Sequence, residues 1–344
     1  MPASLPSKTR TTSKEVGGAT AVLQPGAETA GSIRPPAGPS HPQPAAPARF
    51  GGLRFLHAKH LFLGPALIYM LGVIILPFLF TIALSLSSWS GSKPGLGKLG
   101  LMNYKNLLTD GRFWNSLLTL VIVVVVAFCL EYWIGMGLAL LLANKRKGDR
   151  FFRVLFLAPM MVTPSVIAAV WRTMFHESLG PFNDIAHRLG FAGVHWLSNN
   201  TMALVSVIIV DVWQWTSFLF IILLAGLLQL PFEPYEAAAI DGASKFQTFR
   251  YITLPLLHPV NVGVTLIRLI EMSKIMETIY VLTSGGPGTF TETTSYYILI
   301  RGFREFRLGY ASALSLVYLV LMTTALTFLA KVLMREGRTQ EVGT

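Results

Sequence analysis

Six long hydrophobic stretches, separated by polar segments, follow a polar N-terminal region of the chain. They lie at residues 61–86, 116–142, 154–175, 203–230, 259–282 and 310–333. Each is long enough to cross a hydrocarbon core of about 30 Å as a helix that rises 1.5 Å per residue. Lipid offers no partner to an unpaired backbone group, so these segments must be helices. The pattern predicts an all-α polytopic membrane protein with a six-helix domain over residues 50–344.

Composition supports this class. Hydrophobic residues make up 52% of the 344 residues and charged residues only 13%, whereas a soluble domain carries about 25% charged residues. The net charge of +11 would suggest a nucleic-acid partner for a soluble protein. In a membrane protein it reflects basic residues in cytoplasmic segments, so we expect membrane lipid around the chain and no nucleic acid.

Residues 1–49 are rich in Pro, Ala, Gly, Ser and Thr, and this composition predicts a disordered tail.

The distribution of Lys and Arg predicts how the helices are oriented. If the N-terminus is inside, the inner segments carry 17 basic residues and the outer loops carry eight. The densest group is KRKGDRFFR at 145–153. Cytoplasmic loops carry the excess of basic residues, so both termini and the loop between the fourth and fifth spans are expected in the cytoplasm. Pro159 and Pro164 are expected to kink the third span.

A polar segment at 231–258 separates the fourth and fifth spans. Pro231 and Pro234 end the fourth span, because proline and the residue before it resist continuation of a helix. A short helix is expected from Tyr235 to Ala239, with the carboxylate of Glu236 in its first turn, where it suits the helix dipole. Gly242 is expected to provide a bend or a close backbone approach.

The spacing of particular residues in this segment carries a resemblance. Glu236-Ala237-Ala238 is followed after three residues by Gly242, then by Ile252 and by Leu254-Pro255. The chain thus resembles the permease subunits of ABC importers, in which this pattern marks the cytoplasmic coupling loop. The stretches LLAGLLQLPFEPYEAA, IYVLTSGGPGTFTETTSYYI and GFREFRLGYASALS narrow the resemblance to permeases for carbohydrates.

The resemblance implies a fold, a function and partners. The fold is the six-helix permease fold of type I ABC importers with a cytoplasmic coupling helix, in a bacterial inner membrane. The partners are a second homologous permease, two ATP-binding cassette subunits that bind ATP and Mg²⁺, and an extracytoplasmic sugar-binding protein. The chain itself is then a conducting subunit without cofactor. In the coupling segment, 231–258, the residues implied to meet the ATPase are Glu236, Ala237, Ala238, Asp241, Gly242, Ile252, Leu254 and Pro255. Alternatively, Glu236 and Asp241 cap and orient the loop itself.

Charged residues inside the fifth span are candidates for the solute pathway. A charged side chain at the centre of a lipid-facing helix costs roughly 2.5–3.5 kcal/mol. Arg268, Glu271, Lys274 and Glu277 should therefore face the bundle interior, a water-filled pathway or the partner permease. Their spacing of three favours pairing within the helix, Arg268 with Glu271 and Lys274 with Glu277. Either the pairs support structure or gating, or they contact the sugar directly.

The fourth span carries Asp211, Trp213, Gln214 and Trp215. Hydrogen-bonding groups beside an aromatic ring suit a sugar, and packing within the bundle is the alternative. Glu131 in the second span is expected to be paired structurally.

Sequence signals for catalysis or metal binding are absent. There is no G-x-x-x-x-G-K-[ST], no HExxH and no GxSxG, and Cys129 is the only cysteine. No catalytic residue and no metal site are therefore predicted. Two rival functions are an intramembrane enzyme that acts on a lipid-linked carrier and a secondary transporter. The first predicts clustered catalytic acids in loops, and the second gives the coupling motif no purpose.

Overall fold

The computed structural model describes residues 52–91, 95, 97–143 and 148–341. The N-terminal segment 1–49, for which the sequence predicts disorder, lies outside them. The chain divides into two compact units at Leu63 and Gly64, and the arrangement given below is that of residues 64–341. The elements are helices, and an isolated antiparallel bridge pairs Ser87 with Leu99.

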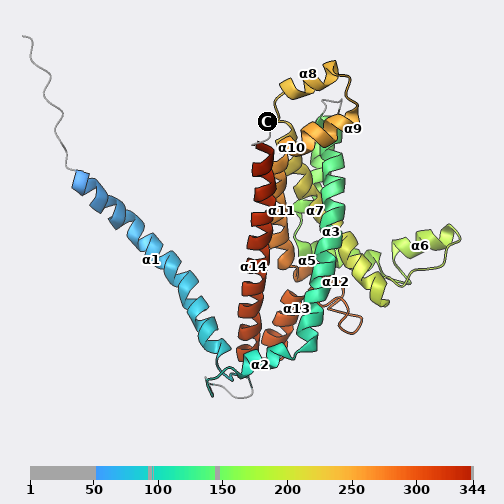
Figure 1. The fold of residues 1–344 in the computed structure, drawn as a ribbon. Helices are drawn as coiled ribbons and strands as arrows, with labels where there is room; N and C mark the ends of the chain where they lie inside the picture. The colour runs from blue at the N-terminus through green and yellow to red at the C-terminus, as the bar shows by residue number, and fades with distance from the viewer. Residues whose placement is uncertain (1–51, 92–94, 96, 144–147, 342–344) are drawn as a thin grey trace, which may run out of the picture. The chain divides into compact units, whose positions relative to one another are not determined.

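The helices of the described residues are of very different lengths (Figure 1). The four long ones are α1 (Gly52–Ser85), α3 (Gly111–Ala143), α7 (Asn200–Leu227) and α14 (Leu308–Glu341). The N-terminal and central short ones are α2 (Met102–Leu108), α4 (Asp149–Leu157), α5 (Pro164–Met174), α6 (Pro181–Arg188), α8 (Glu233–Ile240) and α9 (Lys245–Thr248). The later ones are α10 (Leu254–Leu256), α11 (His258–Ser273), α12 (Glu277–Leu282) and α13 (Thr294–Leu299). A 3-10 turn η1 (Ala158–Met161) and two π turns, η2 (Phe249–Thr253) and η3 (Ile300–Arg304), complete the set.

Within the described residues, four helices are long and apolar enough to cross a membrane, and counting each of two bent helix pairs as one span gives six. The first pair, Asp149–Met161 with Pro164–Met174, is bent by 95°. The second pair, Lys245–Leu256 with His258–Ser273, is bent by 68°. The expected kink in the third span is confirmed, since Pro159 lies in η1 and Pro164 starts α5.

The fifth span differs from its prediction as one helix over 259–282. Helix α11 ends at Ser273, and α12 begins at Glu277, after three intervening residues. The break frees backbone carbonyls, and neighbouring hydroxyls bind them: Tyr318 donates to Ser273 O, while Thr293 and Ser295 donate to Ile275 O at 2.8 and 2.9 Å. Irregular backbone at membrane depth is tolerated where protein groups satisfy it in this way.

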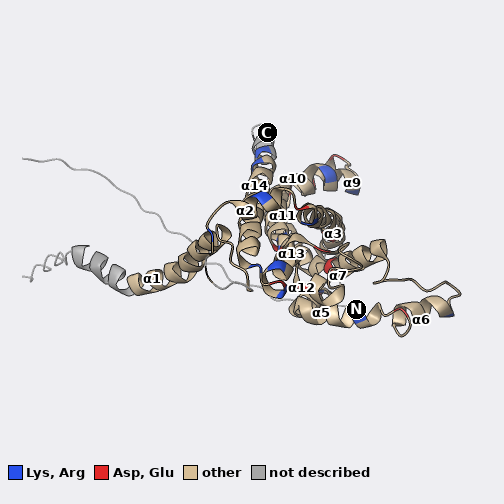
Figure 2. Ribbon diagram, turned by 90° about the horizontal axis from the view of Figure 1, so that it is seen from below, with Lys and Arg blue, Asp and Glu red and all other residues tan. Residues whose placement is uncertain are grey.

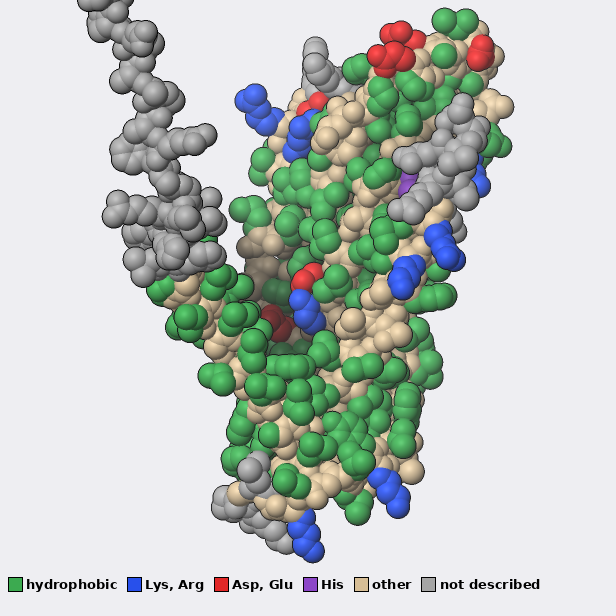
Figure 3. Space-filling view, turned by 60° about the vertical axis from the view of Figure 1, so that its left-hand side comes forward, with side chains coloured by type: hydrophobic (Ala, Val, Ile, Leu, Met, Phe, Trp, Pro, Cys, Tyr) green, Lys and Arg blue, Asp and Glu red, His purple; other side chains and the backbone are tan. Residues whose placement is uncertain are grey.

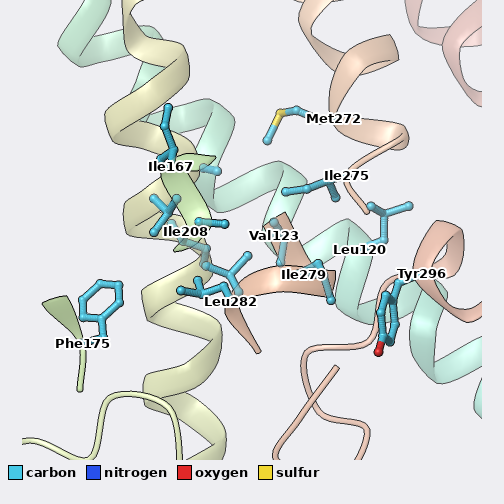
Figure 4. Packing of buried hydrophobic residues seen from close by; sticks show 14 of the residues in the cluster. Leu120, Val123, Ile167, Phe175, Ile208, Met272, Ile275, Ile279, Leu282 and Tyr296 are labelled. Carbon is cyan, nitrogen blue, oxygen red and sulfur yellow. The ribbon is translucent and has the colours of Figure 1, made fainter. Parts of the chain in front are cut away.

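Helix packing builds a core around α7. Helix α3 packs along α7, and α11 contacts α3, α7 and α14. Figure 4 shows side chains of several helices converging in the largest hydrophobic cluster, where Val123, Ile208 and Ile279 are buried. Figure 1 places α8 and α9 at one end of this bundle and α2 and α13 at the other. The coupling segment and the loops around α2 and α13 therefore lie at opposite ends of the bundle.

A polar cluster fastens the end of the bundle that holds α2 and α13. Asp110 accepts hydrogen bonds from the hydroxyls of Tyr297 and Tyr310 and from the backbone N–H groups of Arg112 and Phe113. Burial raises the pKa of Asp110, but these hydrogen bonds outweigh it and leave the pKa below its ordinary value. Asp110 is thus a fixed anion that joins the ends of α3, α13 and α14.

The surface suits lipid or another membrane protein. Few residues of the ribbon are charged (Figure 2). Hydrophobic side chains cover most of the face in Figure 3, and a small group of acidic and basic side chains lies among them. In α1, only 6% of the most apolar window is buried within the chain. Such an uncovered apolar surface requires a nonaqueous neighbour.

Candidate functional site

A buried ion triad joins three helices at the centre of the bundle. The guanidinium of Arg268 (α11) donates to both carboxylate oxygens of Glu131 (α3), from Nε and Nη2, at 2.7 Å each. Nη2 also donates to Asp211 Oδ2 (α7) at 2.6 Å. The indole of Trp215 lies 4.8 Å from the guanidinium carbon. Arg268, Glu131 and Asp211 are 1%, 0% and 3% exposed.

The triad is strong in geometry and unbalanced in formal charge. A bidentate arginine–carboxylate pair is among the strongest charge-assisted hydrogen bonds, and Arg268 adds a second carboxylate to it. With both acids ionised the triad carries one excess negative charge. Removing one member of such a buried group leaves an uncompensated charge, which is strongly destabilising. The triad therefore holds α3, α7 and α11 in a fixed relation.

The predicted pairing within the fifth span is wrong. Arg268 bonds Glu131 and Asp211 rather than Glu271, because Arg268 faces into the bundle and reaches two other helices. Lys274 pairs instead with Glu271, at 2.9 Å. Glu277 lies beyond the break that ends α11, so the helical phase is lost there, and it accepts a hydrogen bond from Ser165 at 3.2 Å. The expectation that Glu131 is paired is confirmed.

Most of these residues, but neither Glu131 nor Ser165, line a cavity of about 250 Å³, which we call the charged cavity. Its lining comprises Pro164, Asp211, Trp215, Arg268, Glu271, Met272, Lys274, Ile275, Met276, Glu277 and Thr278. Charged groups of both signs, an aromatic ring and apolar side chains therefore face one space. Such a mixture is typical of small-molecule sites, where a few polar groups fix the orientation of the ligand.

Two residues that the sequence suggested for this site lie elsewhere. Gln214 is buried and donates to Val162 O at 3.0 Å, which ties α7 to the bend of the third span. Trp213 is 45% exposed and its ring meets that of Trp171 at 5.7 Å. Trp213 stands two residues after Asp211, on another face of α7, and Gln214 is engaged by its hydrogen bond to Val162 O, so neither lines the charged cavity.

Sequence reasoning selected Trp213 for the pathway, whereas the tryptophan that lines the charged cavity is Trp215. It stands four residues after Asp211, and residues four apart lie on the same face of a helix. That spacing, rather than proximity in sequence, distinguishes Trp215 from Trp213. Glu131 was recognised as a paired acid, but nothing in its local sequence indicates that its partner is Arg268, 137 residues away.

The coupling segment forms a helix and a turn at one end of the bundle. Helix α8 carries Glu236 in its first turn, as predicted. Glu236, Ala237 and Asp241 are exposed, whereas Ala238 is 7% exposed. Gly242 follows with a φ of +74°, and a Cβ added there would meet no atom within 4 Å. The backbone angle therefore favours glycine, whereas no close approach among the described residues demands it.

The second half of the coupling segment leads into the fifth span. Ser244 and Gln247 form a capping box that starts α9. Ile252, Leu254 and Pro255 are half-buried in η2 and α10. Four large apolar side chains of the segment remain uncovered: Phe232, Ile240, Phe246 and Tyr251, which are 79%, 87%, 75% and 75% exposed.

The family model described as "Binding-protein-dependent transport system inner membrane component" matches residues 132–336. The match takes in the ion triad helices α7 and α11, the charged cavity and the whole coupling segment. The chain belongs to this family. It is a permease component of an ABC importer, and the family places it in the inner membrane.

Relatives named as transport permeases match between 74% and 78% of this chain. A probable ABC transporter permease of Sinorhizobium fredii is 41% identical, over 74% of this chain and 83% of the relative. The trehalose/maltose transport system permease MalF of Thermococcus litoralis is 38% identical, over 78% of this chain and 92% of the relative. The sulfoquinovosyl glycerol transport system permease SmoG of Agrobacterium fabrum is 33% identical, over 76% of this chain and 85% of the relative.

The fold is also that of a solved transporter. A chain of a bacterial ABC transporter involved in the import of the acidic polysaccharide alginate matches with a TM-score of 0.73 and 20% identity. The match covers 82% of this permease and 97% of that chain. The predicted six-helix fold of type I importer permeases is confirmed.

We expect Gly242→Asp to reduce the amount of ATPase that co-purifies with the permease by at least about tenfold. Such a change corresponds to a loss of roughly 1.4 kcal/mol in binding free energy. Aspartate tolerates positive φ better than most residues, and its side chain has open space in this chain, so the bundle should stay folded. A matched control is Gly190→Asp near α6, where φ is +82° and a Cβ also meets nothing within 4 Å. Equal ATPase recovery from the two variants would show that the Gly242 surface binds no ATPase.

Proposed function

We propose that this permease and a second homologous permease form the pathway for a sugar or sugar derivative. An extracytoplasmic binding protein delivers the sugar, and two separate ATP-binding cassette subunits dock on the coupling segment. In this proposal the ATPase subunits bind ATP and Mg²⁺ and hydrolyse ATP. The permease contributes the pathway and the coupling surface, through Glu236, Ala237, Ala238, Asp241 and Gly242.

The observation that carries the substrate class is the charged cavity, in a family whose relatives include permeases named for trehalose/maltose and for sulfoquinovosyl glycerol. Asp211 holds Arg268 through Oδ2 and also lines the cavity. The indole of Trp215 adds an apolar face beside it. Carboxylate acceptors for hydroxyl groups next to an aromatic ring are the chemistry that a sugar ring requires.

Within the cavity we propose distinct roles. Asp211 and Glu277 accept hydrogen bonds from the sugar, and Trp215 contacts its apolar face. Arg268 acts as a positioning residue, since it is held by Glu131 and in turn holds Asp211. Lys274 and Glu271 pair with each other at the break in the fifth span and are candidates for a gate.

The test is transport by the reconstituted complex. The permease is co-expressed with its partner permease and ATPase subunits, placed in proteoliposomes, and assayed with labelled trehalose, maltose and glucose in the presence of the binding protein. We expect uptake of a sugar that requires ATP inside and binding protein outside. Uptake without ATP would indicate a secondary transporter, and chemical turnover of a lipid-linked sugar would indicate an enzyme.

The orientation can be tested independently. We expect an impermeant thiol reagent to label Thr289→Cys but not Arg150→Cys on intact cells, both in a Cys129→Ala background. Arg150 belongs to the basic inner segment, and Thr289 lies in the loop before α13; both are exposed. Permeabilised cells should label at both positions. Labelling of Arg150→Cys alone on intact cells would invert the proposed topology.

A further inference from the structure

A side-chain hydrogen bond joins the coupling helix α8 to the beginning of the fifth span. The hydroxyl of Tyr235, in the first turn of α8, donates to Thr253 Oγ1 at 3.1 Å. Helix α8 is otherwise an exposed element, since Glu236, Ala237, Ala239 and Ile240 are exposed on it. A force applied to α8 therefore has a defined point of attachment to the bundle at Tyr235.

Thr253 is well placed to receive such a force. It is 5% exposed and is the last residue of the π turn η2. Its hydroxyl accepts from Tyr235 and donates to Thr248 O at 3.4 Å, which uses both capacities of a hydroxyl. π turns inside helices are frequent at functional sites, because the extra residue gives the helix a second available register.

The backbone continues from Thr253 into α11 despite the bend of 68°. Leu257 N–H donates to Thr253 O at 2.9 Å, and Asn261 N–H donates to Leu257 O at 2.8 Å. Leu257 itself is fully buried. Hydrogen bonds thus run without interruption from the Thr253 residue across the bend to the helix that carries Arg268.

We infer that Tyr235 and Thr253 form the link through which movement of the docked ATPase subunits reaches the charged cavity. The inference rests on the proposed docking at the coupling segment. Neither residue lines the cavity, so both are positioning residues. Loss of the link should leave ATPase binding and ATP hydrolysis in place while the cavity no longer responds to nucleotide.

The test removes single hydroxyl groups and measures the response of the cavity without any sugar. Met276, which lines the cavity, is replaced by cysteine in a Cys129→Ala background as a reporter. The labelling rate of Met276→Cys by a thiol reagent is measured in the purified complex, without nucleotide and after trapping with MgATP and vanadate. A coupled site should change its rate roughly fivefold or more.

We expect Tyr235→Phe and Thr253→Val each to reduce the nucleotide-dependent change in labelling rate to within about twofold. The double variant should lose little more, because both substitutions remove the same hydrogen bond. Co-purified ATPase and basal ATP hydrolysis should stay at the parental level. Tyr69→Phe is the matched control. It removes a tyrosine hydroxyl of α1, outside the coupling segment, which is 74% exposed and makes no hydrogen bond within the described residues, and it should keep the full change.

Three results would overturn the inference. They are a parental response in both single variants, independent additive losses in the double variant, and an unresponsive cysteine in the parent complex. Reduced ATPase recovery in Tyr235→Phe would assign the bond to the folding of α8 instead. Failure of the parent permease to co-purify any ATPase is a different outcome, because it removes the proposed docking itself and with it the inference.

Discussion

Arg268→Met should be lost almost entirely from the folded, membrane-inserted fraction. The substitution keeps an unbranched apolar stem but leaves Glu131 and Asp211, which are 0% and 3% exposed, without their shared cation. Breaking a buried ion pair by removal of one partner costs about 3–5 kcal/mol, a large part of the stability of a typical domain. The measurement is the yield of monodisperse permease after detergent extraction and size-exclusion chromatography.

A charge-matched rescue separates this effect from simple loss of packing. The triple variant Arg268→Met, Glu131→Gln, Asp211→Asn has no ionised group at the triad, and we expect its yield to recover. Arg188→Met is the control, because Arg188 pairs with Asp184 on the surface, where their side chains are 77% and 58% exposed. Such a pair contributes at most about 1 kcal/mol. Wild-type yield of the Arg268→Met single variant would contradict the structural role of the triad.

The ion triad also shows where prediction from sequence stops. The cost of charge in lipid was enough to predict that Arg268 faces away from lipid. They could not select its partner, because local spacing offered Glu271 and the actual partners come from α3 and α7. The choice depends on which helices pack together, and the burial of Asp211 and Glu131 beside Arg268 is a property of the assembled bundle.

The break in the fifth span has the same origin. No local signal in residues 259–282 ends a helix at Ser273, because residues 264–282 contain neither proline nor glycine. The break persists because Thr293, Ser295 and Tyr318 supply donors to the freed carbonyls. Those donors come from later elements, so only the tertiary structure reveals them. Local signals were sufficient for the coupling segment, where Pro231, Pro234 and Gly242 fix the backbone themselves.

The broken fifth span changes what Glu277 is expected to do. It does not neutralise Lys274, which pairs with Glu271, so removing its charge leaves no unpaired cation. Its recorded contact is the hydrogen bond from Ser165 at 3.2 Å, and a neutral amide oxygen can accept that bond too. Glu277→Gln should therefore fold and bind ATPase normally.

Transport by Glu277→Gln should nevertheless fall by at least about tenfold. A hydrogen bond to a charged acceptor contributes about 1.5–3 kcal/mol, and Glu277 offers its carboxylate to the charged cavity. The measurement is the initial rate of ATP-dependent uptake of maltose or trehalose, whichever the reconstituted complex transports. Yield and ATPase recovery are measured in the same preparations, so that loss of transport is separated from loss of assembly.

Two further variants decide why transport falls. Ser165→Ala removes the hydrogen bond between α5 and Glu277 but leaves the carboxylate in the cavity, and we expect it to keep most of the uptake. Asp184→Asn neutralises an exposed carboxylate of α6, outside the cavity, and should have no effect. If Ser165→Ala lowers uptake as far as Glu277→Gln, the residue acts by joining α5 to α12 rather than by meeting the sugar. If Glu277→Gln transports at the wild-type rate, its carboxylate has neither role.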